Sequence, residues 1–473
     1  MRYCNEQLFR SQFEFLKRQF LQDGGLPFTD VLSRETVEEA LDTIEVTWNE
    51  RIYTPLVTLW VFLGQVLSAD HSCRNAVARL VVHRVSHGLS VCSSRTGAYC
   101  QARKRLPEQF FSTIARMVGR KLENQAKERW LWKGHHVYMF DGTTTLMPDT
   151  EANVEAYPQT WNQQGGVGLP LARVAAIFSL SCGVILDLKI AKYAGKGQGE
   201  LTLLHKMANL FSEGDVLLAD ALMCNWRVLY SFKQHGADVV TRLNKAQRKA
   251  DFRRGTRLGK DDHLVKWAKP SRRRNIDRET YMSMPEHILV REVRVRIKQS
   301  GFRTKSMVIV TTLLDPVLYT KKDLADLYRE RWNNELDLRS IKSVMQMECL
   351  RGKTPELVRK EIWTHVLAYN LIRTIMAQAA TQNGLLPRTI SFKGTLQTLE
   401  AFQPVIALIG NHNSATRISL YQQLLAAIVL HRVKDRPNRF EPRRHKRRHK
   451  HYVPLSVPRA EAKLQMLKGL SKN

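Results

Sequence analysis

Residues 327–344 read LYRERWNNELDLRSIKSV, and this stretch is the most informative part of the chain. Four polar side chains recur in it at offsets of 0, 3, 7 and 14 residues: Tyr328, Arg331, Glu335 and Lys342. At about 100° per residue, an α-helix carries all four on one stripe about 60° wide. Such a stripe is normally apolar, because it is the face that a helix buries. A carboxylate between two cations suits a metal ligand beside a bound phosphate, although a salt-bridged surface helix is the alternative.

Two more acids each follow a short apolar strand. Asp141 comes after the strand predicted at 136–140 (HVYMF), and Asp220 ends the strand predicted at 215–220 (DVLLAD). A single Asp at a strand end caps a turn more often than it binds a metal, so the spacing carries the argument. The intervals are 79 residues (220 − 141) and 115 residues (335 − 220).

The spacing Y-x2-R-x3-E-x6-K resembles the signature of IS4-type DDE transposases, and every position of that signature is present. The order DGT, LLAD and helical signature resembles this family over about two thirds of the chain. The resemblance implies that Asp141, Asp220 and Glu335 are the catalytic, metal-binding carboxylates. It also implies that Tyr328, Arg331 and Lys342 hold phosphates of the transposon end.

Three carboxylates gathered at one place repel each other unless cations lie between them. Ligands that are all oxygen fit Mg²⁺ or Mn²⁺ rather than zinc. Two such ions about 3.5–4 Å apart would polarise a phosphodiester, activate water or a 3′-OH, and stabilise the leaving oxygen. We therefore expect two Mg²⁺ (or Mn²⁺) ions in each active site.

The composition points to a nucleic-acid partner. The 473 residues include 74 Lys or Arg against 44 Asp or Glu, which gives a net charge of +30. Such an excess destabilises a folded chain by self-repulsion unless a polyanion shares it. An anionic membrane is the weaker alternative, because the basic residues are not confined to one amphipathic helix.

The chain shows no sign of export. Residues 1–20 lack the apolar core of a signal peptide, and the apolar run at 53–69 is short and reads as a buried helix. The seven cysteines form no CxxC pair, so a zinc site or a disulfide framework is not expected. These features favour the bacterial cytoplasm, in association with the nucleoid.

The fold class expected is α/β, with an RNase H-like (retroviral integrase-like) mixed sheet. Strands are predicted at 136–140, 171–180, 184–193, 215–220 and 237–243, with helices at 200–211 and 226–234. That order resembles the core of integrases and transposases. Further helices are predicted at 322–349, 355–381, 394–410 and 415–431. Residues 195–200 (GKGQGE) lack a complete P-loop pattern and read as a glycine-rich helix entry.

We expect five regions. They are a helical DNA-binding domain (1–130), the first part of the core (131–244), a β-rich basic insertion (245–320), the second part of the core with the Glu335 helix (321–385), and a helical C-terminal region with a basic tail (386–473).

Further DNA contacts are expected outside the core. The basic cluster Arg103, Lys104 and Arg105 suits a DNA groove or backbone, although a solvated helix face is equally compatible with it. In relatives, a tryptophan of the insertion stacks on a flipped base, which makes Trp267 the candidate, against the alternative of a core residue. The segment 432–450 carries ten Lys or Arg and would add nonspecific affinity.

Taken together, the sequence favours a cut-and-paste DNA transposase. As the resemblance implies, a dimer would bind double-stranded DNA at the terminal inverted repeats and cut it through hairpin ends before joining it to target DNA. Two alternatives stay open. One is a transposase-derived DNA-binding protein that is no longer catalytic, and the other is an RNase H-type nuclease without strand joining.

Overall fold

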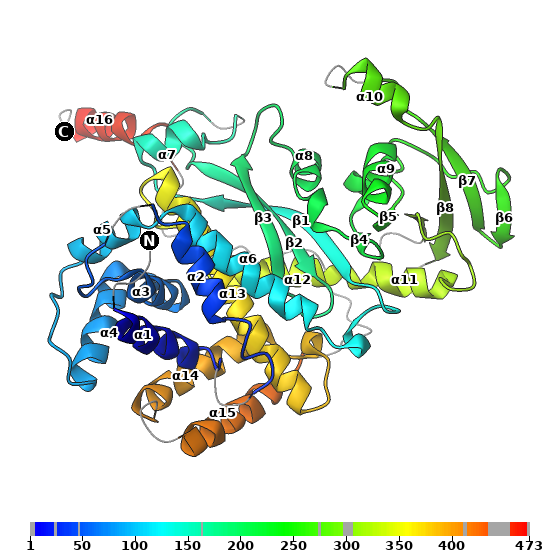
Figure 1. Ribbon diagram of the computed structural model, residues 1–473. Coiled ribbons are helices and arrows are strands. Elements are labelled where there is room, and N and C mark those ends of the chain that lie inside the picture. Colours follow the sequence, from blue (N-terminus) through cyan, green and yellow to red (C-terminus); the bar gives the residue numbers. More distant parts are fainter. Residues whose placement is uncertain are drawn as a thin grey trace.

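The computed structural model describes residues 5–22, 26–45, 48–161, 164–272, 276–296, 306–409, 414–433 and 455–470. One long sheet crosses the molecule, and helices from both ends of the chain pack together at one end of it (Figure 1). Most of the basic tail predicted at 432–450 lies outside the described residues. Every helix in the described ranges is too short or too polar to span a lipid bilayer.

Helices fill the part of the chain before the first strand, as predicted. Several begin at a polar residue whose side chain accepts a hydrogen bond from the backbone N–H three residues later, as Asn5, Ser33, Thr54 and Ser72 do. Their bounds are Glu6–Gln19 (α1), Arg34–Asp42 (α2), Pro55–Leu67 (α3), Cys73–Ser86 (α4), Gly97–Arg105 (α5) and Glu108–Asn124 (α6).

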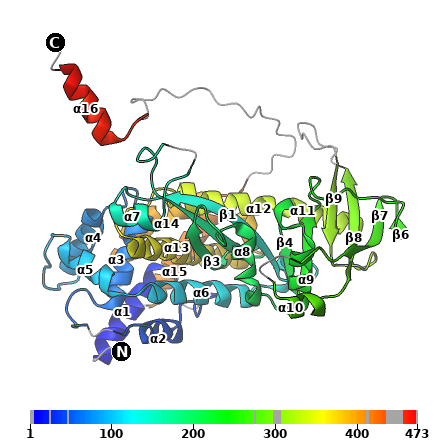
Figure 2. The same ribbon diagram turned by 90° about the horizontal axis from the view of Figure 1, so that it is seen from above.

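The C-terminal helices complete this helical region. The longest, Pro355–Gln382 (α13), is buried along most of its length and packs against α3 and α6. It is followed by Phe392–Ile409 (α14) and Ser414–Val429 (α15), so the predicted helices at 355–381, 394–410 and 415–431 are confirmed. The last helix, Arg459–Leu470 (α16), stands away from the others in Figure 2.

The sheet begins with the strand order expected of an RNase H-like core. Its first five strands lie in the order β3-β2-β1-β4-β5. Strand β2 runs antiparallel to both of its neighbours, β1 and β3, whereas β1, β4 and β5 are parallel to one another. The fold class predicted from sequence is confirmed. The bounds are Val137–Leu146 (β1), Leu171–Ser179 (β2), Ile185–Lys192 (β3), Val216–Leu218 (β4) and Asp238–Arg242 (β5).

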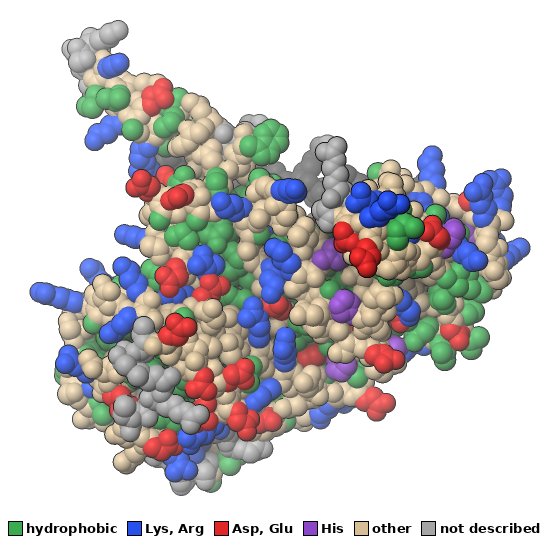
Figure 3. All heavy atoms as spheres, turned by 45° about the horizontal axis from the view of Figure 1, so that its top comes forward, with side chains coloured by type: hydrophobic (Ala, Val, Ile, Leu, Met, Phe, Trp, Pro, Cys, Tyr) green, Lys and Arg blue, Asp and Glu red, His purple; other side chains and the backbone are tan. Residues whose placement is uncertain are grey.

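The insertion continues this sheet. Strand β9 pairs antiparallel with β5, and the order then runs β9-β8-β7-β6 to the edge. The bounds are Thr256–Gly259 (β6), Asp262–Ala268 (β7), His287–Arg296 (β8) and Ser306–Thr311 (β9), with helix Arg278–Ser283 (α10) between β7 and β8. Figure 3 shows Lys and Arg side chains spread over both the helical region and the insertion.

Short helices connect the strands of the core. They are Glu151–Ala156 (α7), Glu200–His205 (α8) and Trp226–Gln234 (α9), with 3₁₀ turns at Glu128–Trp130, Ala208–Leu210, Ala221–Met223 and Pro387–Thr389. The predicted glycine-rich entry to a helix at 195–200 is thus confirmed, and the helix predicted at 200–211 splits into α8 and a 3₁₀ turn.

Helix α6 lies so close to β3 that one position has no room for a side chain. A Cβ at Gly119 would come within 2.5 Å of the Ile185 carbonyl oxygen and 2.9 Å of Asn370 Nδ2. Asn370, on α13, also donates to the carbonyls of Ala115 and Ile185 and accepts from the Ile185 N–H. This contact fixes α6 and α13 together against the sheet.

Gly119→Ala should therefore lower the free energy of unfolding by about 1–3 kcal/mol, because the added methyl forces the backbones apart. Urea denaturation of the purified chain measures the change. Gly64→Ala is the matched control, since a Cβ at Gly64 in α3 meets nothing within 4 Å. That variant should gain about 0.5–1 kcal/mol from helix propensity. Equal stability of Gly119→Ala and wild type would contradict this account of the packing.

Candidate active site

Three charged side chains share one register near the carboxyl edge of the parallel strands. Met139 of β1 pairs with Leu218 of β4, which pairs with Val240 of β5. Two residues further along each strand are Asp141, Asp220 and Arg242. Neighbouring strands lie about 4.8 Å apart, so the sheet itself brings the two predicted catalytic aspartates side by side.

Asp141 lies where β1 extends beyond its partner β4. Its neighbour on the other side, β2, continues, with Ala176 opposite Asp141. The Gly142 N–H donates to the Asp141 carboxylate at 2.8 Å. Burial raises the pKa of Asp141 to about 6, and the negative charges of Asp220 and Glu200 act in the same direction, while the Gly142 N–H and Arg331 oppose the rise. The carboxylate is thus held in a place where a cation would be favourable.

Asp220 follows β4 directly and begins the 3₁₀ turn Ala221–Met223, where its side chain accepts from the Leu222 N–H at 2.8 Å. The Thr241 hydroxyl donates to the Asp220 carbonyl at 2.6 Å. The backbone at Asp220 is therefore fixed from β5, which keeps its carboxylate at the edge.

The helix that carries Glu335 is not the single regular helix that the sequence predicted at 322–349. It is divided into Lys321–Glu330 (α11), Trp332–Arg339 (α12) and a π-helical turn, Ser340–Val344. At the first junction the Arg331 N–H bonds to the Tyr328 carbonyl and the Asn334 N–H to the Arg331 carbonyl, which is tighter than α-helical spacing. Arg331 and Glu335 still pair one helical turn apart, so the predicted stripe holds as far as Glu335, and the π-helical turn interrupts it before Lys342.

Arg331 links the helix to the strand edge. Its guanidinium donates to Glu335 Oε1 at 3.0 Å, and its positive charge opposes the rise in the pKa of Asp141. Tyr328 is buried, and burial raises the pKa of its phenol. The structure thus brings Asp141, Asp220, Glu335, Arg331 and Tyr328 into one neighbourhood.

The three predicted carboxylates do not form a coordination shell. Within the described ranges, no three His, Cys, Asp or Glu side chains lie close enough to share one metal ion. The Glu335 carboxylate is 42% exposed and engaged by Arg331. The donor set still fits a hard divalent cation, because all its atoms are carboxylate oxygens and because a cation would relieve the repulsion at Asp141.

Lys342 lies in the π-helical turn and is partly exposed. The wider turn shifts it from the position that a regular helix would give. Among the basic residues of α5, Lys104 and Arg105 are exposed, so their contact with DNA stays a prediction.

Two predicted DNA contacts do not fit the structure. Trp267 is 4% exposed, because its indole N–H donates to Glu292 Oε1 at 2.8 Å and the Arg248 guanidinium covers its ring at 4.5 Å. Arg103 is also buried, where it donates to Gln65 Oε1 at 3.2 Å and stacks on Tyr99. Trp267 is therefore a core residue of the insertion, and Arg103 stabilises the helical region.

Two residues at the site were missed in the sequence. Arg242 is exposed at the end of β5, and a strand register could have revealed it. Glu200, the first residue of α8, packs against the strand next to Asp141. A Cβ at Gly142 would come within 2.6 Å of Glu200 Oε1, so the Glu200 side chain lies directly against the backbone beside Asp141. Arg173 of β2 holds Glu200 by an ion pair of 2.9 Å.

Asn334, which precedes Glu335, is fully buried. Within the part of the chain that the structure describes, neither its Oδ1 nor its Nδ2 has a hydrogen-bond partner. A buried amide in this state destabilises the fold by about 1–3 kcal/mol. Such groups are rare in native proteins, and functional sites are among the places where they occur.

Comparison with known proteins gives the family. The model described as "Transposase DDE domain" matches residues 132–371, about half of the chain and including Asp141, Asp220 and Glu335. The chain is an IS4-family DDE transposase. Transposase InsG for insertion sequence element IS4 of Escherichia coli (strain K12) is 25% identical over 406 residues, which cover 83% of this chain and 87% of InsG.

Shorter and more distant similarities exist as well. The transposase for insertion sequence element IS421 of Escherichia coli is 38% identical to this transposase over 69 residues, 15% of this chain and 19% of that protein. Among solved structures, the piggyBac transposase synaptic complex with hairpin DNA has a TM-score of 0.41 and 8% identity, covering 88% of this chain and 84% of that one. As a DDE transposase, this enzyme acts on DNA and belongs to a family that uses divalent metal ions.

Asn334→Leu should stabilise this transposase, because it removes a buried amide that destabilises the fold by about 1–3 kcal/mol. The midpoint of urea denaturation should rise. Asn370→Leu is the matched control, since the Asn370 amide makes hydrogen bonds to Ala115 and Ile185 and its loss should lower the midpoint. A fall in stability for Asn334→Leu as large as that for Asn370→Leu would show that Asn334 has a partner in solution.

Proposed function

We propose that this transposase moves its own insertion sequence by cut and paste, with Asp141, Asp220 and Glu335 as its catalytic residues. The observation that supports this most is the shared register of Asp141 and Asp220 at the edge of two parallel strands. The ion pair of Arg331 with Glu335, together with the effect of the Arg331 charge on the pKa of Asp141, supports Glu335 as the third carboxylate.

The three carboxylates would hold two Mg²⁺ ions, which polarise the scissile phosphodiester and stabilise the leaving oxygen. In this proposal Glu335 exchanges its ion pair with Arg331 for the metal when DNA arrives. Arg331 is then free to bind a phosphate of the transposon end. A guanidinium suits that exchange, because it binds carboxylates and phosphates with the same fork of donors.

The remaining polar groups would hold the DNA. Arg242 is an exposed cation in register with Asp220, so it would bind a phosphate close to the scissile bond. Tyr328 would position a phosphate through its hydroxyl, and Lys342 would neutralise charge further along the strand. Lys104 and Arg105 would contact the flanking duplex.

The reaction would proceed by successive phosphoryl transfers in one site. Water attacks the phosphorus at the transposon end and frees a 3′-OH, which then attacks the opposite strand and leaves a hairpin end. A second hydrolysis reopens the hairpin, and the 3′-OH joins target DNA. Each step exchanges one phosphodiester oxygen for another, so no ATP is needed.

Two copies of the chain would act together, one on each terminal inverted repeat, in the bacterial cytoplasm. The net charge of +30 supports prolonged binding of DNA, because neutralised phosphates release counterions. A nuclease that only hydrolyses would not need to retain the cut ends. A non-catalytic DNA-binding descendant would have no need for three acids at one edge.

Asp141→Asn, Asp220→Asn and Glu335→Gln should each abolish cutting while leaving affinity for the DNA ends within about threefold of wild type. A gel assay with Mg²⁺ and linear DNA carrying the inverted repeats resolves nicked, hairpin and joined products. Asp187→Asn, a carboxylate on β3 away from the site, is the control and should remain active. An active single variant of the triad would refute the assignment. Cutting without joined product by wild type would favour the nuclease, and no cutting would favour the non-catalytic binder.

Arg242→Ala should weaken binding of transposon-end DNA. It should also lower the slope of log K against log salt concentration by about one, because one fewer counterion is released. Arg242→Lys should keep most of the salt dependence, because it keeps the charge. Binding is measured by fluorescence anisotropy between 50 and 200 mM salt, as about 10³–10⁵-fold changes are typical across that range. An unchanged slope for Arg242→Ala would remove Arg242 from the DNA interface.

A further inference from the structure

Two residues after Glu335, helix α12 carries a second carboxylate that is fully buried. Asp337 is 0% exposed. Residues two apart on a helix point about 200° away from each other, so Asp337 faces the interior while Glu335 faces outward. A buried carboxylate is strongly unfavourable unless it is paired and hydrogen-bonded, so its partners carry information.

Those partners are two arginines from other elements. Arg388, in the 3₁₀ turn Pro387–Thr389, donates from Nη1 to both Asp337 oxygens, at 2.8 and 2.6 Å. Arg373 of α13 donates from Nη2 to Asp337 Oδ1 and is itself buried. Both arginines lie C-terminal to residues 132–371, the part of the chain that matches the family model.

The same arginines hold the turn between β2 and β3. Arg388 donates from Nε to the Leu180 carbonyl at 2.9 Å and from Nη2 to the Ser179 carbonyl. Arg373 donates to the Tyr369 hydroxyl, which donates to the Gly183 carbonyl at 2.8 Å. A Cβ at Gly183 would come within 2.8 Å of Arg373 Cζ, so the turn packs directly on the guanidinium.

This network connects Glu335 to Asp141 by a short, rigid path. Asp141 pairs with Ala176 of β2, and β2 ends three residues later at Ser179, whose carbonyl Arg388 binds. Arg388 in turn binds Asp337 on the helix of Glu335. The distance between two of the proposed metal ligands is therefore set through β2 and a buried ion pair.

Helix α12 needs such an anchor, because the contacts at its two ends do little to stabilise it. It has eight residues, no side-chain cap at its start, and a π-helical turn at its end. The chain beyond that turn is fixed to β1, where the Leu146 N–H donates to the Glu348 carbonyl and the Leu350 N–H to the Leu146 carbonyl, both at 2.9 Å. The anchor at Asp337 is much closer to Glu335 in sequence.

We propose that Asp337 and Arg388 are positioning residues that hold Glu335 at the distance from Asp141 that metal binding requires. The proposal rests on the role of Glu335 as a metal ligand. It extends the catalytic machinery beyond the DDE domain, to the segment that leads into α14 and α15. Partners that orient metal ligands typically contribute about 10–100-fold to metal affinity or activity.

The test uses the full-length chain and Mn²⁺ alone as the probe, with its dissociation constant measured by electron paramagnetic resonance. Asp337→Asn keeps the shape of the side chain and removes its charge, and Arg388→Lys keeps the charge and removes the forked contacts. Both should weaken Mn²⁺ binding by about tenfold or more. Both should also raise the Mg²⁺ concentration needed for half-maximal cutting, while affinity for the DNA ends in metal-free buffer stays unchanged.

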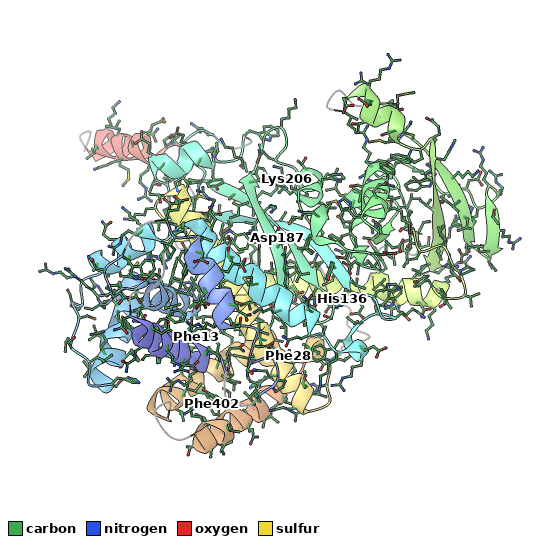
Figure 4. The ribbon with its side chains drawn as sticks, in the orientation of Figure 1. Phe13, Phe28, His136, Asp187, Lys206 and Phe402 are labelled. Carbon is green, nitrogen blue, oxygen red and sulfur yellow. The ribbon has the colours of Figure 1, made fainter. Side chains whose placement is uncertain are left out.

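Asp187→Asn is the matched control. Asp187, labelled in Figure 4, lies on β3 and is bound by Arg116 at 2.6 Å and Lys189 at 3.0 Å, so it too is a carboxylate with two cations. Its loss should lower the melting temperature without changing Mn²⁺ affinity. If Asp337→Asn does not fold, the Arg388→Lys variant alone tests the proposal. It should fold, because the Arg388 side chain is 14% exposed and the lysine keeps the positive charge beside Asp337.

Wild-type Mn²⁺ affinity and Mg²⁺ dependence in the folded variants would overturn the proposal, whatever happens to stability. Glu335→Gln separates this failure from failure of the proposed function. If Glu335→Gln loses Mn²⁺ affinity and the anchor variants do not, only the positioning role is refuted. If Glu335→Gln binds Mn²⁺ like wild type, the metal-binding role of Glu335 is refuted as well.

Discussion

Two acidic side chains lie side by side at one edge of the sheet, and one of them is largely buried, so the surrounding structure has to stabilise their charge. Parallel pairing of β1 and β4 places Asp141 and Asp220 in the same register, and burial raises the pKa of Asp141 to about 6. This arrangement is stable only because contacts from several elements hold the two carboxylates in place. Backbone hydrogen bonds hold the strands, and Arg331 supplies positive charge between Asp141 and Glu335.

The helix that completes the site is stabilised from outside rather than by its own sequence. An eight-residue helix is too short to be stable alone, and α12 has neither a capping side chain nor a regular end. It also buries the unsatisfied amide of Asn334. The ion pairs of Asp337 and the bridge from β1 to residues 347–350 offset these costs. The third carboxylate can therefore remain exposed and exchange partners, while the helix that carries it stays in place.

The sequence predicted those parts of the site that follow from local patterns. Apolar runs followed by acids located Asp141 and Asp220, because such runs form buried parallel strands. Asp220 follows β4 as expected, whereas β1 continues to Leu146, so Asp141 lies within the strand and not at its end. The position of Lys342 was not predictable, because the helical wheel assumes an unbroken helix and the break depends on tertiary contacts. Burial of Arg103 and Trp267 was not predictable either, since a basic or aromatic residue looks the same in sequence whether its partner is DNA or another side chain.

The insertion explains how 115 residues can separate Asp220 from Glu335 without disturbing the site. It leaves the core at the end of β5 and returns as β9, which pairs with β5 so that Arg242 lies opposite Ile309. The two ends of the insertion are therefore hydrogen-bonded neighbours, and the insertion forms a closed loop on the edge of the core. The entropy of closing a loop grows only slowly with its length, so extra strands at this point cost the core little. The same pairing places the basic insertion beside Arg242, at the edge where the proposed phosphate contacts lie.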